Sequence, residues 1–152
     1  MAGWTNKGKF SALDAYMRNA GAPANFNIAL FTSATTPTAD TNLVSGLTQI
    51  ATGNGYADGG LAVNRNATDF DVLTEDDTND RGLVQIKDIV WTAAGGPIPA
   101  SGGGARWAAL TDDNATVASR EVYFYWDLVS DRSVSDGQTL TLQDCEIRIN
   151  EA

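Results

Sequence analysis

The order of apolar and polar residues along the chain first predicts a helix over residues 6–19. Its apolar positions recur at the spacing of a single helix face, namely Phe10, Leu13 and Met17, supported by Ala12 and Tyr16. Thr5 or Asn6 can cap the start of the helix, and Gly21 followed by Pro23 ends it. Packing of the apolar face on the protein's own sheet is the simpler interpretation, and docking of this face onto a partner is the alternative.

After the helix the pattern changes to a period of two, which predicts strands. The segment "FNIALFT" begins at Phe26 and alternates between two faces, and "REVYFYWDLV" near the end of the chain alternates in the same way. In the second segment we expect one set to point inward: Val122, Phe124, Trp126 and Leu128. Tyr123 and Tyr125 are on the opposite face, where aromatic side chains indicate a second packed layer or an interface.

Two other strand segments change phase partway along. In "GLVQIKDIVWT" the parity of the apolar positions changes after Ile86, and in "QTLTLQDCEIRIN" it changes after Leu142. A β-bulge inserts one extra residue into a strand and shifts the alternation by one. We therefore predict one bulge near Lys87 and Asp88 and another near Gln143 and Asp144.

One helix followed by seven or eight short strands predicts a mainly β protein with a single domain, residues 1–152. The architecture that we expect is a β-sandwich or jelly-roll-like barrel over residues 26–150, preceded by the short N-terminal helix. Trp91 and Trp126 fall at core positions of this pattern. The single cysteine, Cys145, is expected to be a buried small apolar residue.

Composition argues against several classes of function. The 152 residues include 10 basic and 19 acidic side chains, for a formal charge of −9, and the basic residues are scattered. Such a surface repels phosphate backbones and anionic membranes, so we expect neither a nucleic-acid nor a membrane partner. Histidine is absent, which removes the commonest general base and metal ligand. The sequence thus predicts a soluble protein that is not an enzyme, with no cofactor, made in a reducing cytoplasm.

The acidic stretch "TDFDVLTEDDTNDRG", residues 68–82, raises the question of a metal or catalytic site. No register of this stretch supplies the oxygen ligands, the central glycine and the final glutamate of an EF-hand loop. Two alternatives remain open at this point. One is a calcium site of a different type, formed by Asp76, Asp77 and Asp80. The other is a catalytic acid–base pair, formed by Asp69 and Asp71.

The favoured interpretation of this stretch is a strand end over residues 68–73 that runs into an acidic turn. The turn then leads to the strand at 82–92, and its charges face water or a neighbour. Arg81 and Arg65 are the nearest residues that could neutralise them. The glycine-rich segments "DGGLAVNRN" and "GGPIPASGGGAR" lack the spacing of a phosphate-binding loop, so we interpret them as turns.

Three stretches together carry a family resemblance that spans essentially the whole chain: "NFNIALFTSATTPTADT", "GNGYADGGLAVNRNATDFDVLTEDD" and "GGARWAAL…REVYFYWDLVSDRSVSDGQTLTLQ". In order and spacing they resemble small virion structural proteins of tailed bacteriophages. The resemblance implies a capsid decoration (cement) protein, a homotrimer that binds the major capsid protein and stabilises the head. It would be made in the host bacterial cytoplasm and lie on the capsid surface.

Alternatives to this function are a tail or fibre-base protein, a head–tail connection protein and, from a different class, a carbohydrate-binding module. Under the decoration hypothesis the expected contact residues are Phe10, Leu13, Met17, Pro37, Asp40, Asp76, Asp77, Pro97, Pro99, Tyr123 and Tyr125. Two loops, 32–45 and 93–105, are long for segments without regular structure, so we expect them to become ordered on assembly.

Overall fold

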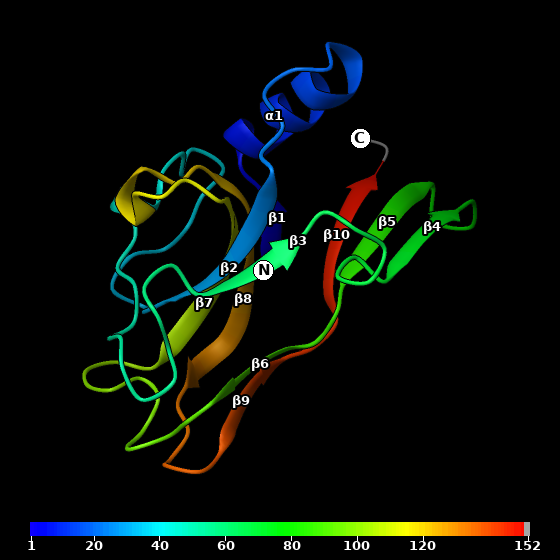
Figure 1. Ribbon diagram of the computed structural model, residues 1–152. Helices are drawn as coiled ribbons and strands as arrows, with labels where there is room; N and C mark the ends of the chain where they lie inside the picture. Colours follow the sequence, from blue (N-terminus) through cyan, green and yellow to red (C-terminus); the bar gives the residue numbers. More distant parts are fainter. Residues whose placement is uncertain (151–152) are drawn as a thin grey trace.

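The computed structural model describes residues 1–150, which form one α-helix and ten strands in three antiparallel sheets (Figure 1). The largest sheet has the order β1 (Ala2–Trp4), β8 (Val122–Arg132), β7 (Ala105–Asp112), β2 (Asn25–Phe31) and β3 (Leu61–Asn64). A three-stranded sheet contains β10 (Cys145–Asn150), β5 (Arg81–Ile86) and β4 (Val72–Asp76), and a two-stranded ribbon contains β6 (Ile89–Thr92) and β9 (Thr139–Leu142).

The N-terminal helix is α1 (Asn6–Met17), and two 3-10 helices, Val44–Gly46 and Val117–Ser119, lie in the loops. The expected mainly β fold with one N-terminal helix is confirmed. The expectation of a barrel is wrong, because none of the three sheets in residues 1–150 closes on itself. In the same part of the chain, no helix is both long enough and apolar enough to span a membrane.

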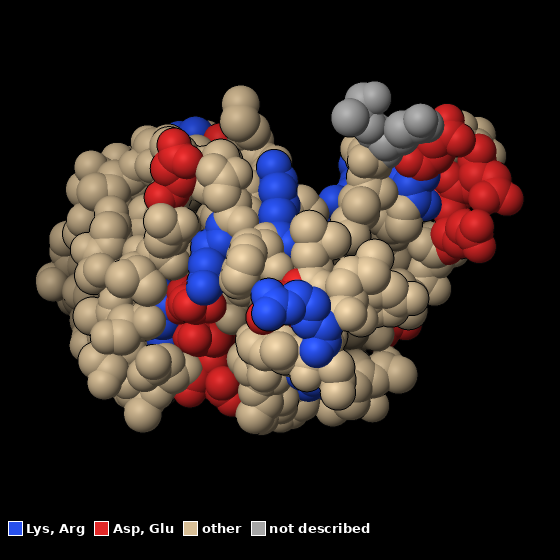
Figure 2. All heavy atoms as spheres, turned by 90° about the horizontal axis from the view of Figure 1, so that it is seen from above, with Lys and Arg blue, Asp and Glu red and all other residues tan. Residues whose placement is uncertain are grey.

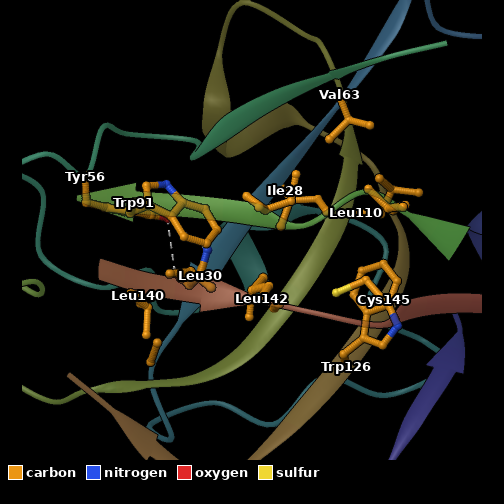
Figure 3. Packing of buried hydrophobic residues seen from close by; sticks show 14 of the residues in the cluster. Ile28, Leu30, Tyr56, Val63, Trp91, Leu110, Trp126, Leu140, Leu142 and Cys145 are labelled. Carbon is orange, nitrogen blue, oxygen red and sulfur yellow. Dashed lines mark hydrogen bonds between the residues drawn. The ribbon is translucent and has the colours of Figure 1, made fainter. Parts of the chain in front are cut away.

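The main core lies where the five-stranded sheet faces the two smaller sheets (Figure 3). The large sheet contributes Ile28, Leu30, Val63, Leu110 and Trp126, and the smaller sheets contribute Ile86, Trp91, Leu140, Leu142, Cys145 and Ile147. Trp91 and Trp126 are only 2% and 8% exposed, so their predicted core positions are confirmed, as is the burial of Cys145. The hydroxyl of Tyr56 accepts a hydrogen bond from the backbone N–H of Leu30 at 2.9 Å within this core.

The two predicted phase shifts are present, but they are strand breaks and not bulges within continuous strands. β5 pairs with β10 and β6 pairs with β9, so the two breaks lie opposite each other in one antiparallel pair of segments, residues 81–92 and 139–150. Across them, Gln143 Nε2 donates to Asp88 Oδ2 at 3.2 Å. Asp144 adopts a left-handed conformation with φ of 53°. At these paired breaks the two segments leave the ribbon of β6 and β9 and enter the three-stranded sheet as β5 and β10.

Strand β8 departs from the predicted alternation at Tyr123. Two consecutive residues of β7 pair with Val122 and Phe124, so Tyr123 is the extra residue of a bulge. The bulge reverses the side on which the following residues lie. Phe124 and Trp126 therefore face the main core, whereas Val122 packs in a second cluster with Tyr125. The prediction that Val122 shares a face with Phe124 and Trp126 is wrong for this reason.

The second cluster covers the other face of the large sheet. It contains Ala29, Phe31, Val44, Trp107, Ala109, Val122 and Tyr125. The loops that carry the 3-10 helices supply its outer layer through Val44, Leu47 and Val117. Tyr125 is consequently 7% exposed, and Tyr123, which packs edge-to-face against Phe26 with 5.7 Å between the ring centroids, is 5% exposed. Their predicted role as outward contact residues is wrong, because the chain's own residues pack over them.

The loops 32–45 and 93–105 are both tied to the rest of the chain. The backbone N–H of Asn6 donates to a carbonyl of the first loop at 2.7 Å. In the second loop, Ile98 and Val134 exchange backbone hydrogen bonds at 3.0 and 2.9 Å. Two expected contact residues of these loops are buried, Pro37 and Pro99. Contacts within the chain thus hold parts of both loops, and their ordering on assembly stays a prediction.

Candidate interaction surface

Helix α1 is anchored at its start by Thr5, which is fully buried. The Thr5 Oγ1 accepts a hydrogen bond from the backbone N–H of Gly8 at 2.9 Å and donates to the carbonyl of Val122 in β8. One hydroxyl thus caps the helix and joins it to the sheet. The predicted cap at Thr5 is confirmed, and the helix ends two residues earlier than predicted, at Met17.

The inward face of α1 consists of small residues, namely Gly8, Ser11, Ala12 and Ala15. Gly8 is the buried residue of the helix, and a Cβ built on it would lie 2.1 Å from the carbonyl oxygen of Tyr123. The large apolar side chains point away from the sheet: Phe10, Leu13 and Met17 are 56%, 61% and 71% exposed. The simpler interpretation, in which this face packs on the protein's own sheet, is therefore wrong.

An open groove of about 380 Å³ lies between α1 and the three-stranded sheet. Its lining is almost entirely apolar and includes Ala12, Phe26, Phe70, Leu83 and Ile147, with Tyr123 at the edge of β8. The Tyr123 hydroxyl donates to Glu121 Oε2 at 3.1 Å. Burial, followed by the nearby Glu121 carboxylate, raises the pKa of Tyr123 above its ordinary value. The tyrosine is thus a neutral, fixed part of the groove.

The far wall of the groove ends in the hairpin formed by β4 and β5. β4 is an edge strand, and β5 is its partner within the sheet. Leu73 on this strand is 82% exposed, and Ile149 on β10 is 66% exposed. Two large apolar side chains of the three-stranded sheet are therefore exposed beside the groove. An exposed strand edge with apolar side chains is a surface suited to contact with another chain.

The hairpin also gathers most of the acidic stretch. Residues 71–81 contain five acidic side chains and one basic one, and Figure 2 shows the acidic patch on one lobe, separated by a cleft from the rest of the molecule. Arg81 Nε pairs with Asp76 Oδ2 at 2.8 Å, so Arg81, as predicted, neutralises one of the acidic side chains of this turn. Hydrogen bonds from Asn79, and then from Arg81, lower the pKa of Asp76. Asp77 at the tip is exposed.

Arg65, the other candidate for neutralising the acidic turn, contacts Pro23 and Phe26 instead. Its Nη1 donates to the carbonyl of Pro23 at 2.8 Å, and its guanidinium lies over the Phe26 ring, 6.0 Å from the centroid. The sequence interpretation was therefore correct for Arg81 and wrong for Arg65.

Asp69 and Asp71, the possible acid–base pair, occupy different environments. Asp69 is 3% exposed, pairs with Lys87 and accepts a hydrogen bond from the backbone N–H of Asn64 at 2.7 Å. The Lys87 ammonium, followed by the Asn64 backbone, lowers the pKa of Asp69. Because Asp71 is exposed, the two carboxyls do not share a site. Asp69 joins β3 to the residue that follows β5, which is a structural role.

A metal site is not formed in residues 1–150, where no group of three His, Cys, Asp or Glu residues is placed to hold an ion. The calcium site considered for Asp76, Asp77 and Asp80 is therefore absent from this part of the chain. Cys145 is 5% exposed, and burial raises the pKa of its thiol to about 11. The thiol is thus protonated and shielded in the folded protein.

Of the eleven expected contact residues, six are exposed: Phe10, Leu13, Met17, Asp40, Asp77 and Pro97. Asp76 is half-buried, and Pro37, Pro99, Tyr123 and Tyr125 are buried. Asp40 lies at the start of α1, where its Oδ1 accepts from Asn6 Nδ2 at 2.8 Å. Sequence reasoning missed Leu73 and Ile149, although an apolar residue between the acidic positions of "DVLTEDD" was a usable signal.

A scan against protein-family models, a search of curated proteins and a search of solved structures each find no match to this chain.

Proposed function

We propose that this chain is a non-enzymatic structural protein of a tailed-bacteriophage particle that decorates the head by binding the major capsid protein. The observation that carries the proposal is the apolar surface at the α1 end of the molecule. Phe10, Leu13, Met17 and Leu73 are each more than half exposed there, beside an open apolar groove. Large exposed apolar side chains on α1 and on β4 are typical of surfaces that contact another macromolecule.

Two further features support a structural role. The large sheet packs against the smaller ones in the manner of a sandwich, and this gives α1 a rigid base through Thr5 and Gly8. The chain also resembles small phage virion proteins along its whole length. We propose in addition that it acts as an oligomer, which the resemblance implies to be a homotrimer. Many modest contacts, repeated by symmetry, would then sum to firm attachment.

The test uses heads of the phage that encodes the chain, prepared without it and mixed with purified protein. Bound copies are counted by gel densitometry after the heads are sedimented. The double variant Leu13→Ser with Met17→Ser should bind in far fewer copies. Its free energy of unfolding should stay near that of the wild type, because both side chains are already exposed.

Val90→Thr is the matched control, since Val90 is an exposed apolar residue on the ribbon strand β6, away from α1. It should bind as the wild type does. Undiminished binding by the helix variant would refute the role of α1. Binding of about a dozen copies or fewer per particle would favour the tail, fibre-base or connector alternative, since those positions are few by symmetry.

A further inference from the structure

Basic side chains flank the exposed apolar face of α1. On a helix, Lys9 falls on one side of the line through Phe10, Leu13 and Met17, while Lys7 and Arg18 fall on the other. Lys7 pairs with Glu121 at 2.8 Å, and Arg18 pairs with Asp14 at 3.3 Å. Lys9 is exposed and forms no ion pair within residues 1–150. Lys7 and Arg18 are thus each neutralised by an acidic partner, and Lys9 is left as an unpaired positive charge beside the apolar face within the described residues.

The β4–β5 hairpin has the opposite character. Its residues 71–81 carry Asp71, Glu75, Asp76, Asp77 and Asp80 against Arg81, so five negative charges and one positive charge leave a net charge of −4. Arg81 pairs with Asp76 alone. The other four carboxylates form no ion pair within the described residues. Leu73, 82% exposed, lies within this acidic surface.

The two surfaces lie on opposite sides of the groove, as Figures 1 and 2 show. None of the ion pairs within residues 1–150 joins α1 to the hairpin. One chain thus carries an apolar surface beside the unpaired Lys9 and a separate apolar surface with acidic borders. Surfaces that are complementary in charge attract and orient one another when two molecules meet.

We propose that α1 of one copy of this chain packs against the β4–β5 hairpin of a second copy. Leu73 of one copy would lie against the face formed by Phe10, Leu13 and Met17 of the other, with the acidic side chains beside Lys9. Each copy offers both surfaces, so the contact is head-to-tail, and it closes into a ring where the rotation between copies permits. This inference rests on the oligomer in the proposed function and identifies the surfaces that form it.

Symmetric alternatives are less favourable on the same charges. A contact between two hairpins would bring together two surfaces of net charge −4 each. Pairing of two β4 edges would have the same defect, because like charges placed across an interface oppose association. A contact between two α1 faces would offer no opposite charge to the unpaired Lys9 of either copy. Only the pairing of helix with hairpin places unlike charges at the border of an apolar contact.

The experiment is a charge exchange, measured as self-association of the purified chain by sedimentation velocity over a range of concentrations. Lys9→Glu and Asp77→Lys should each weaken self-association about tenfold or more, which corresponds to about 1.4 kcal/mol. The double variant with both substitutions should recover most of the lost association, because the reversed charges again face each other between copies. Leu73→Ser should weaken association without a change in the far-ultraviolet circular dichroism spectrum.

Arg132→Glu is the control, since it makes the same charge change as Lys9→Glu at an exposed position at the opposite end of β8 from α1. It should associate as the wild type does. A wild-type chain that stays monomeric, or a double variant that does not recover, would overturn the inference. Head binding distinguishes the two proposals: variants that decorate heads but do not self-associate refute this contact alone. A self-associating chain that leaves heads bare refutes the proposed function alone.

Discussion

A Cβ on Gly8 would lie 2.1 Å from the carbonyl oxygen of Tyr123, so α1 rests directly on the backbone of β8. The atom that it would meet belongs to the backbone and cannot rotate away. The Thr5 hydroxyl fixes the same approach by donating to the carbonyl of Val122. A helix this close to a strand can present only small residues to it. The outward direction of Phe10 and Leu13 follows from this contact.

Gly8→Ala should destabilise the protein by about 2–3 kcal/mol through the clash with β8. The direction of the change in the free energy of unfolding is informative, because alanine is a better helix former than glycine by about 1 kcal/mol and would otherwise stabilise α1. Urea unfolding gives the difference in the free energy of unfolding. Gly46→Ala is the control, since nothing lies within 4 Å of a Cβ at that position. A Gly8→Ala protein as stable as the wild type would contradict the close approach.

Thr5→Val should lower the free energy of unfolding by about 1–2 kcal/mol, since valine keeps the shape of threonine and loses the capping oxygen. Thr5→Ser keeps the hydroxyl that accepts from the Gly8 N–H. It should therefore retain most of the stability of the wild type. Thermal and urea unfolding of the two variants provide the comparison. A Thr5→Val protein as stable as the wild type, together with a loss in Thr5→Ser, would show that the methyl group, and not the cap, stabilises this site.

The sequence was sufficient to predict the helix, its cap and the presence of strands, because these depend on neighbouring residues. The spacing of Phe10, Leu13 and Met17 identified a helix face correctly. It could not show whether that face meets the sheet, because this depends on the distance between α1 and β8. Gly8 carried the missing information, since a glycine inside a helix disfavours the helix unless a close approach requires it.

The alternation of apolar positions showed where the strands are interrupted. It did not show whether an interruption is a bulge within a strand or a break between two strands. The shift after Ile86 marks a break between sheets, because the paired segment breaks at the opposite position, between β9 and β10. In β8 the apolar residues alternate in the sequence without a shift. Because of the bulge at Tyr123, however, Val122 and Phe124 pack in different clusters. Only the pairing partners in β7 reveal that bulge.

Asp69→Asn should make stability less dependent on pH. The folded pKa of Asp69 is lowered by Lys87, so the carboxylate contributes stability above its unfolded pKa near 4, and that stability is lost as the pH falls through the folded pKa. The variant should be less stable than the wild type at about pH 7, and the gap should close once the pH falls below the folded pKa of Asp69, where the carboxyl is protonated and resembles asparagine. Asp77→Asn, at an exposed position, is the control.

Urea unfolding at several pH values would measure the gap between Asp69→Asn and the wild type. A gap that stays constant across the acid range would show that the ion pair with Lys87 contributes nothing and that the asparagine only disturbs packing near Asn64.

Two indole rings cover the outer edge of β10, which has β5 as its partner on the other side. Trp4 Nε1 donates to the carbonyl of Arg148 at 2.8 Å, and Trp126 Nε1 donates to the carbonyl of Glu146 at 3.0 Å. These carbonyls are two residues apart, as expected for groups on the same edge of a strand. The indoles thus take the place of a neighbouring strand, and they attach the small sheet to β1 and β8.

Trp4→Phe should loosen β10 by removing one of these hydrogen bonds, at a net cost of about 1 kcal/mol. Cys145 at the start of β10 reports the loosening, because its buried thiol, with a pKa of about 11, reacts only when the strand opens. Labelling by a thiol reagent should become roughly fivefold faster or more. Trp107→Phe is the control, since its indole N–H has no hydrogen-bond partner within residues 1–150. Equal labelling rates in both variants would show that the Trp4 bond does not hold this strand.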